Sequence, residues 1–164
     1  MSKKVTKISA KNEALFDSLT QEALSLIGNT SNTINQSALS LLEQAIKIAQ
    51  DAADIDRTCY CWGIFVYAYL KPGEESKNKE YLLKAVEYGD KASEIMDNSE
   101  RGMGFFAEWY YNIGLANMYF RNRTLQADAA LRKAKFLYEN WDNEERVETI
   151  EELLNLLNTV IHFE

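Results

Sequence analysis

The chain contains 164 residues, a length typical of one domain, and its 46% hydrophobic residues suffice for a continuous core. Its formal net charge is -7, and residues 142–164 hold seven acids against one arginine, so the rest of the chain is nearly neutral. Because a general nucleic-acid binder needs a basic surface to neutralise phosphates, this distribution argues against DNA or RNA as a partner.

Composition also favours an all-α protein without a membrane-spanning segment. A single proline and seven glycines leave long runs of the strong helix formers Ala, Leu, Glu, Lys and Gln. No apolar run approaches the roughly 20 residues of a membrane span, and the basic start of the chain does not resemble a secretory signal. The only cysteines, Cys59 and Cys61, would point apart on a helix, so we expect no disulfide, a reducing cytoplasmic location and no membrane partner.

The spacing of apolar residues predicts seven helices in one domain. Residues 1–11 are expected to form a flexible tail, and residues 12–164 a single helical domain. Apolar residues recur at steps of three and four along each predicted helix, and turn-forming residues separate the helices. The predicted helices cover about 12–27, 34–54, 57–70, 77–96, 105–120, 125–140 and 143–162.

Capping residues indicate where several of these helices begin and end. Gly28 is expected to stop the first helix. Thr33 with Gln36 three residues later forms a capping box for the second helix, and Asp142 with Glu145 forms one for the last. These signals set the expected limits of the turns between helices.

The third and last helices differ in how their apolar residues are distributed. The third is apolar nearly all round, which implies burial on several sides, and residues 71–74, with Pro72, are expected to close it after Leu70. The last helix has one apolar stripe opposite a row of acids, so it is expected to cover the end of the helical stack.

The stretch from Ala107 to Tyr119, followed by Ala127, Leu131 and Ala134, resembles the tetratricopeptide pattern. An aromatic residue precedes Asn-aliphatic-Gly, and alanines at steps of four and three mark a second helix. The resemblance implies an all-α, irregular right-handed α-solenoid of tetratricopeptide-like hairpins with a C-terminal capping helix. The implied elements are hairpins over about 12–54, 57–96 and 105–140, and a capping helix over about 143–162.

An internal alignment extends this resemblance and shows its departures. Gly63 of the second hairpin aligns with Gly114 of the third, whereas the first hairpin has Thr20. The spacing between repeats is 40 to 51 residues, compared with about 34 in the family. In the second helices, Leu42, Ala45 and Ile46 recur as Leu82, Ala85 and Val86 and as Leu131, Ala134 and Lys135.

Stacking as in that family would place the first helix of each hairpin along a concave face. Tyrosine and methionine there would make an apolar, adaptable wall with hydroxyls for a peptide backbone. The resemblance therefore implies a non-enzymatic protein–protein interaction module, adaptor or chaperone-like, that binds a partner peptide or helix. The expected partner-binding residues are Arg57, Tyr60, Ile64, Tyr67, Glu108, Tyr111, Leu115, Met118 and Tyr119.

Three alternatives remain at this point. The aromatic residues can simply form the core beneath the first or last helix. The amphipathic last helix can pair with a second copy to give a homodimer. The concave face can also hold a small apolar ligand.

The sequence offers no set of residues that is typical of catalysis or of metal binding. The only histidine, His162, stands alone near the end, and Cys59 with Cys61 lacks the spacing of a redox or zinc motif. The acids of the last helix follow one another along a helix, without oxygen ligands that converge from elsewhere. No glycine-rich phosphate loop follows a predicted strand. We therefore expect no catalytic residues, no cofactor and no metal.

Overall fold

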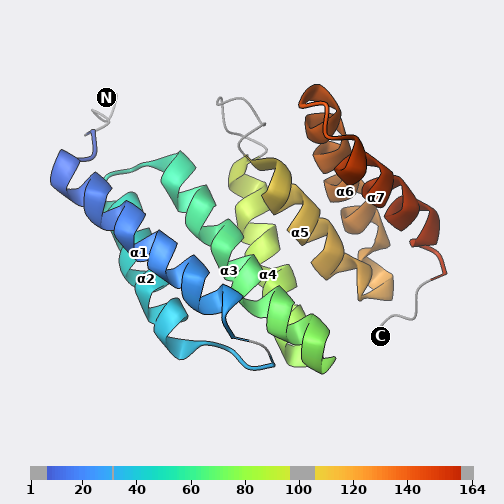
Figure 1. Ribbon diagram of the computed structural model, residues 1–164, viewed down its shortest axis with the longest axis horizontal. Helices are drawn as coiled ribbons and strands as arrows, with labels where there is room; N and C mark the ends of the chain where they lie inside the picture. Colours follow the sequence, from blue (N-terminus) through green and yellow to red (C-terminus); the bar gives the residue numbers. More distant parts are fainter. Residues whose placement is uncertain (1–6, 31, 97–105, 160–164) are drawn as a thin grey trace.

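A computed structural model describes residues 7–30, 32–96 and 106–159, and the prediction of an all-α protein is confirmed for them. Over these residues the chain forms seven α-helices and one short 3-10 helix, η2 (Figure 1). The elements are α1 (Ala10–Gly28), α2 (Gln36–Asp51), α3 (Ile55–Ser76), α4 (Lys79–Met96), α5 (Ala107–Met118), η2 (Arg121–Arg123), α6 (Thr124–Asn140) and α7 (Glu144–Leu156).

Asparagine and serine side chains cap helices at positions that the sequence analysis missed. Ser9 caps α1, Asn35 caps α2 and Asn143 caps α7, each accepting a hydrogen bond from the backbone N–H three residues later. The capping boxes predicted at Thr33 and Asp142 are therefore wrong. An asparagine closer to the first turn meets the same unpaired N–H groups in both cases.

Helix α3 does not stop at Leu70 as predicted but includes Pro72 and runs to Ser76. The proline lacks an N–H, but its own carbonyl still accepts a hydrogen bond from the Ser76 hydroxyl at 2.6 Å. The turn comes at Lys77, which has a left-handed backbone with φ of 53°. The helix thus ends at a left-handed residue, and the proline lies within its last turns.

Consecutive helices pack in pairs. The most extensive contacts join α1 to α2, α3 to α4 and α5 to α6, and these pairs follow one another across the molecule (Figure 1). Neighbouring pairs meet where α2 contacts α3 and where α5 contacts both α3 and α4. Helix α7 packs along α6 at the end of the row.

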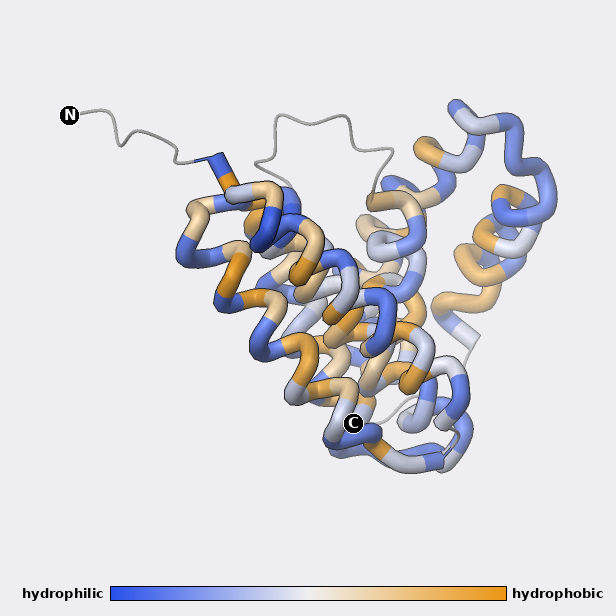
Figure 2. Tube along the Cα trace, turned by 60° about the vertical axis from the view of Figure 1, so that its left-hand side comes forward, coloured by the Kyte–Doolittle hydropathy of each residue, from blue (hydrophilic) through white to orange (hydrophobic). Residues whose placement is uncertain are grey.

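Small residues let the helices approach closely in the core. Ala45, Ala85 and Ala134, aligned from the sequence, are completely buried, and polar residues occupy the outward turns of the helices (Figure 2). Ile150 of α7 is buried, and so is Leu157, which directly follows the helix. The apolar stripe of α7 therefore packs against α6 of the same chain.

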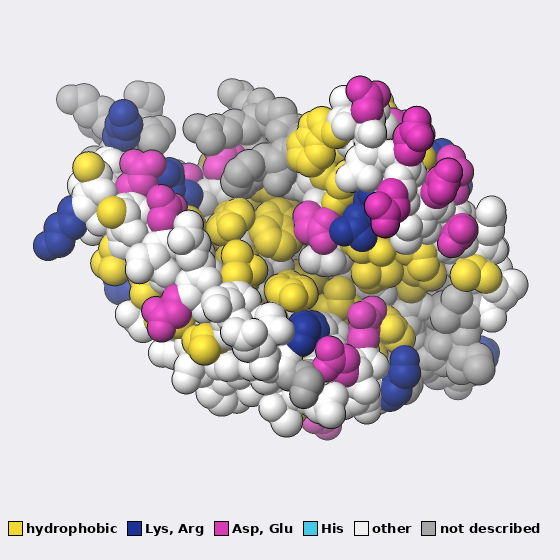
Figure 3. All heavy atoms as spheres, viewed as in Figure 1, with side chains coloured by type: hydrophobic (Ala, Val, Ile, Leu, Met, Phe, Trp, Pro, Cys, Tyr) yellow, Lys and Arg dark blue, Asp and Glu magenta, His cyan; other side chains and the backbone are white. Residues whose placement is uncertain are grey.

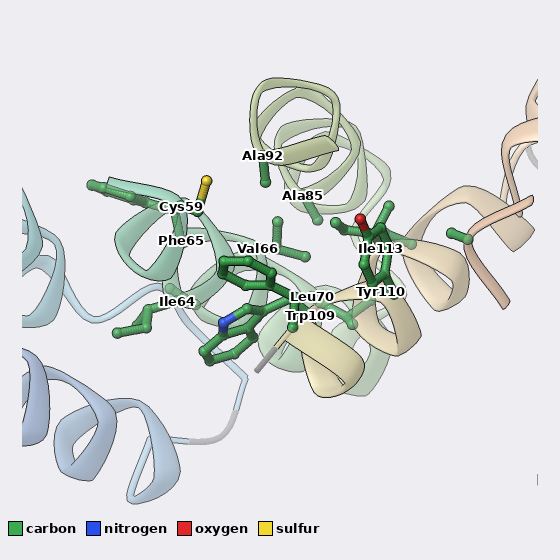
Figure 4. Packing of buried hydrophobic residues seen from close by; sticks show 14 of the residues in the cluster. Cys59, Ile64, Phe65, Val66, Leu70, Ala85, Ala92, Trp109, Tyr110 and Ile113 are labelled. Atoms are coloured by element: carbon green, nitrogen blue, oxygen red, sulfur yellow. The ribbon is translucent and has the colours of Figure 1, made fainter. Parts of the chain in front are cut away.

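The two aligned glycines make room for different neighbours. A Cβ atom on Gly63 would lie 2.5 Å from Trp109 Cδ2, because the indole of α5 rests on this point of α3. A Cβ on Gly114 would lie 2.6 Å from side-chain atoms of Leu131, which belongs to α6 of the same pair. Gly63 thus serves the contact between two helix pairs, and Gly114 serves the contact within one. Figure 4 shows Trp109 lying against α3 among the buried residues.

Replacing Gly63 with alanine tests the contact between pairs. The new methyl group overlaps the Trp109 ring, so we expect Gly63→Ala to lower the free energy of unfolding by about 1–3 kcal/mol in chemical denaturation. Gly28→Ala is the matched control, because no atom lies within 4 Å of its added Cβ. A Gly63→Ala protein as stable as the wild type would show that the Trp109 ring can move away from α3 without loss of stability.

Candidate functional site

Eight of the nine residues predicted to bind a partner lie on α3 and α5, two helices that contact each other, and the ninth, Tyr119, directly follows α5. Those that are partly buried and apolar form what we call the groove floor. Figure 3 shows a recessed apolar surface between α1 and α7, on the face of the molecule that is turned toward the viewer. The groove floor consists of Tyr60, Tyr67, Tyr111, Leu115 and Tyr119.

Two of the nine predicted residues do not belong to this surface. Ile64 has no exposed area, and Met118 is only 6% exposed. Ile64 points away from Trp109, toward the side of α3 on which α1 and α2 lie (Figure 4). Both residues are therefore core residues, and their assignment to the partner-binding face is corrected.

Tyr60 is held in place by aromatic neighbours from two other helices. Its ring meets Trp109 edge-on at 5.5 Å between centroids, and it lies 6.3 Å from the ring of Phe16 on α1. Edge-to-face contacts of this kind fix the orientation of a ring as well as burying it. The floor at Tyr60 is thus a shaped surface, set by the packing of α1, α3 and α5.

Arg57 forms the edge of the groove floor toward α1. Its guanidinium lies 2.6 Å from Asp54 Oδ2 and 2.7 Å from Glu13 Oε1, and its Cζ is 5.7 Å from the Phe16 ring centre. The hydrogen bond to Asp54 raises the pKa of Arg57 despite partial burial. Arg57 therefore ties α1 to α3, and its charge is already neutralised by two carboxylates.

At the other edge, Glu108 joins three helices through partners that the sequence analysis missed. Arg146 Nη2 of α7 lies 3.2 Å from Glu108 Oε2, and the Tyr138 hydroxyl of α6 donates to the same carboxylate. The Arg146 guanidinium also lies 4.3 Å from the centre of the Tyr111 ring, a cation–π distance. Arg146 is the only arginine or lysine among residues 142–164, a signal that could have marked it.

Tyr119 contacts Glu74, which lies in α3 and not in the loop that was predicted for residues 71–74. Its hydroxyl donates to Glu74 Oε1 at 3.1 Å, and Lys77 Nζ lies 6.0 Å from the ring centre. Burial raises the pKa of Glu74, although the hydrogen bond from Tyr119 partly offsets this effect. A carboxyl group near the last turn of α3 therefore lies beside the groove floor.

Two cavities of the structure lie away from the groove floor. One, of about 480 Å³, lies between α2 and α4 and is lined by residues that include Tyr69, Tyr81, Lys84 and Glu87. The other, of about 400 Å³, lies between α1 and α2. Neither is lined by any of the nine predicted residues, and the larger has charged groups on its wall.

The thiols and acids provide no reactive cluster in the part of the chain that the structure describes. Burial raises the pKa of Cys59 and of Cys61 to about 12, so both remain protonated thiols at neutral pH. No three His, Cys, Asp or Glu residues converge in a metal-binding arrangement among residues 7–30, 32–96 and 106–159. His162 lies outside the described residues. None of the described helices is long and apolar enough to cross a bilayer.

No family model matches the chain, and no curated protein or solved structure matches it either.

Removing the charge of Glu74 should stabilise the protein at neutral pH. A carboxyl group whose pKa is raised by folding contributes stability that is lost as pH rises through that pKa. We therefore expect Glu74→Gln to melt at a higher temperature than the wild type at pH 7, and the difference to shrink toward about pH 4, where a free glutamate is protonated. Thermal melts followed by circular dichroism measure both values.

The exposed Glu80 provides a control for this change. Glu80→Gln removes the same charge from the surface without relieving a buried carboxylate. A Glu74→Gln protein that is less stable than the wild type at pH 7 would mean that the bond from Tyr119 outweighs the cost of burial.

Proposed function

We propose that this protein is a non-enzymatic interaction module that binds a peptide or helix of another protein on its groove floor. In this proposal, the pairs α1–α2, α3–α4 and α5–α6 act as three tetratricopeptide-like hairpins of an irregular right-handed α-solenoid. Helix α7 covers the end of the stack, and the concave side of α3 and α5 receives the partner. The module acts as an adaptor or as a chaperone-like holder, through shape and apolar burial.

The observation that carries the proposal is the groove floor. Four tyrosines and one leucine, on the contacting helices α3 and α5 and directly after α5, remain partly exposed, although the chain has a large buried core. Tyrosines offer a large apolar area together with a hydroxyl, and few rotatable bonds are lost when they are covered. Such a surface suits a segment that presents apolar side chains and backbone carbonyls.

The surroundings of the groove floor keep it in one shape. The ion pairs of Arg57 connect α1 to α3, and those of Glu108 connect α5 to α7. Because Trp109 and Phe16 hold Tyr60, the floor needs little ordering when a partner binds. A preorganised surface loses less conformational entropy on binding, which favours affinity.

This use of the concave face explains the structure better than pairing of two copies through α7. The apolar stripe of α7 is occupied along α6, with Ile150 and Leu157 buried. Pairing through that stripe would first require α7 to leave α6 and expose both surfaces. The groove floor needs no such rearrangement.

Peptide selection with a double variant tests the groove. Peptides selected from a random library for binding to the wild type should lose at least about tenfold in affinity for Tyr67→Ala/Tyr111→Ala, because two aromatic anchors are removed. Fluorescence anisotropy with labelled peptides measures the affinity. Circular dichroism shows whether the double variant remains folded.

An exposed apolar residue on α4 serves as the matched control. Leu83 is 46% exposed and lines the cavity between α2 and α4, so Leu83→Ala removes exposed apolar area away from the groove floor. The selected peptides should bind this variant as they bind the wild type. Peptides that bind the folded double variant with unchanged affinity would refute the groove as the binding site.

A further inference from the structure

Acidic side chains border the groove floor on the side of α1. Glu13 is paired with Arg57, but the carboxylate of Asp17 makes no ion pair within the described part of the chain. Asp17 is exposed and lies near enough to affect the ionisation of both Tyr60 and Arg57. An exposed negative charge therefore stands next to the aromatic ring that begins the groove floor.

A second acidic border lies along α7. Glu145, Thr149, Glu152 and Leu156 follow one another at steps of four and three, so they share one edge of the helix. Glu151 lies on the other side, where it reaches Lys135 of α6 at 3.3 Å. The edge that carries Glu145 and Glu152 is therefore turned away from α6, and Figure 3 shows acidic groups along α7 beside the recessed apolar surface.

The cations near the groove floor do not balance these borders. Arg57 is bound by Asp54 and Glu13, and Arg146 is bound by Glu108. Lys77 lies beside Tyr119, where its charge acts on the nearby carboxylate of Glu74. Neither Glu145 nor Glu152 makes an ion pair within the described residues. An apolar floor between two negative borders is complementary to a segment with one apolar side and positive charges along its edges.

We propose that the segment bound on the groove floor is a basic amphipathic one, apolar on one side and rich in lysine or arginine on its flanks. This inference rests on the proposed function and specifies the chemistry of the partner. Apolar side chains of the segment cover Tyr67, Tyr111 and Leu115. Its cations lie near Asp17 on one side and near Glu145 and Glu152 on the other.

Two synthetic peptides test the sign of the partner's charge. Each is about 18 residues long, about 27 Å as a helix, with leucines on one side and blocked termini. One peptide carries lysines on its other side, and the second carries glutamates at the same positions. At low salt we expect the lysine peptide to bind the wild type at least tenfold more tightly, and this advantage to fall as salt is added.

Charge-removing variants locate the effect. Asp17→Asn/Glu152→Gln removes one acid from each border and should weaken the lysine peptide about three- to tenfold, while the glutamate peptide binds no worse. Glu43→Gln/Glu80→Gln is the matched control, since it removes two exposed acids from α2 and α4. This control should retain the wild-type affinity for the lysine peptide, which separates a local effect from one of total charge.

The outcomes separate the two proposals. The inference is overturned if the lysine peptide does not bind, if the glutamate peptide binds as tightly, or if both charge variants weaken binding equally. In the last two cases, the groove itself still stands provided that Tyr67→Ala/Tyr111→Ala weakens the bound peptide. If this folded double variant binds both peptides as the wild type does, the proposed function fails as well.

Discussion

The contact between Trp109 and Gly63 is the one on which the arrangement of the helix pairs depends. The Trp109 indole is only 9% exposed, and it occupies the space into which a residue other than glycine at position 63 would place its Cβ atom. Its Nε1 makes no hydrogen bond to a described residue, so shape and burial hold the ring in this orientation. A second close approach, Gly89 to Ile113, joins α5 to α4. Together they set α5 against both helices of the preceding pair.

The same contact shapes the groove floor. Trp109 receives the edge of Tyr60, and Tyr60 in turn meets Phe16 of α1, so the core of one junction supports the surface next to it. This connection explains why a partner-binding role and a packing role cannot be assigned by residue type alone. Tyr110 is 1% exposed, and Tyr111 beside it is partly exposed, because successive side chains on a helix point about 100° apart.

The sequence predicted the helical class and most of the buried positions because apolar spacing and alanine content are local properties. It failed where a distant neighbour decides the outcome. Ile64 is buried because helices distant in sequence pack against its side of α3. Glu74 faces Tyr119 because α3 continues through Pro72. The aligned Gly63 and Gly114 both make room for a large side chain, but Gly63 receives Trp109 from the next helix pair, whereas Gly114 receives Leu131 from its own pair. Only packing reveals this difference.

Charge gives the clearest case of a sequence property that gains meaning from position. From the sequence alone, the acidic C-terminal segment is expected to form a solvated helix face, and its one arginine has no evident role. In the structure that arginine is the anchor: Arg146 binds Glu108 and covers Tyr111, which fixes the edge of α7 against the groove floor. Glu151 pairs with Lys135 of α6, whereas Glu145 and Glu152 make no ion pair within the described residues, so α7 combines ion pairs to α5 and α6 with acids that face outward. A helix that only covered the core would need the apolar stripe and not this placement of charge.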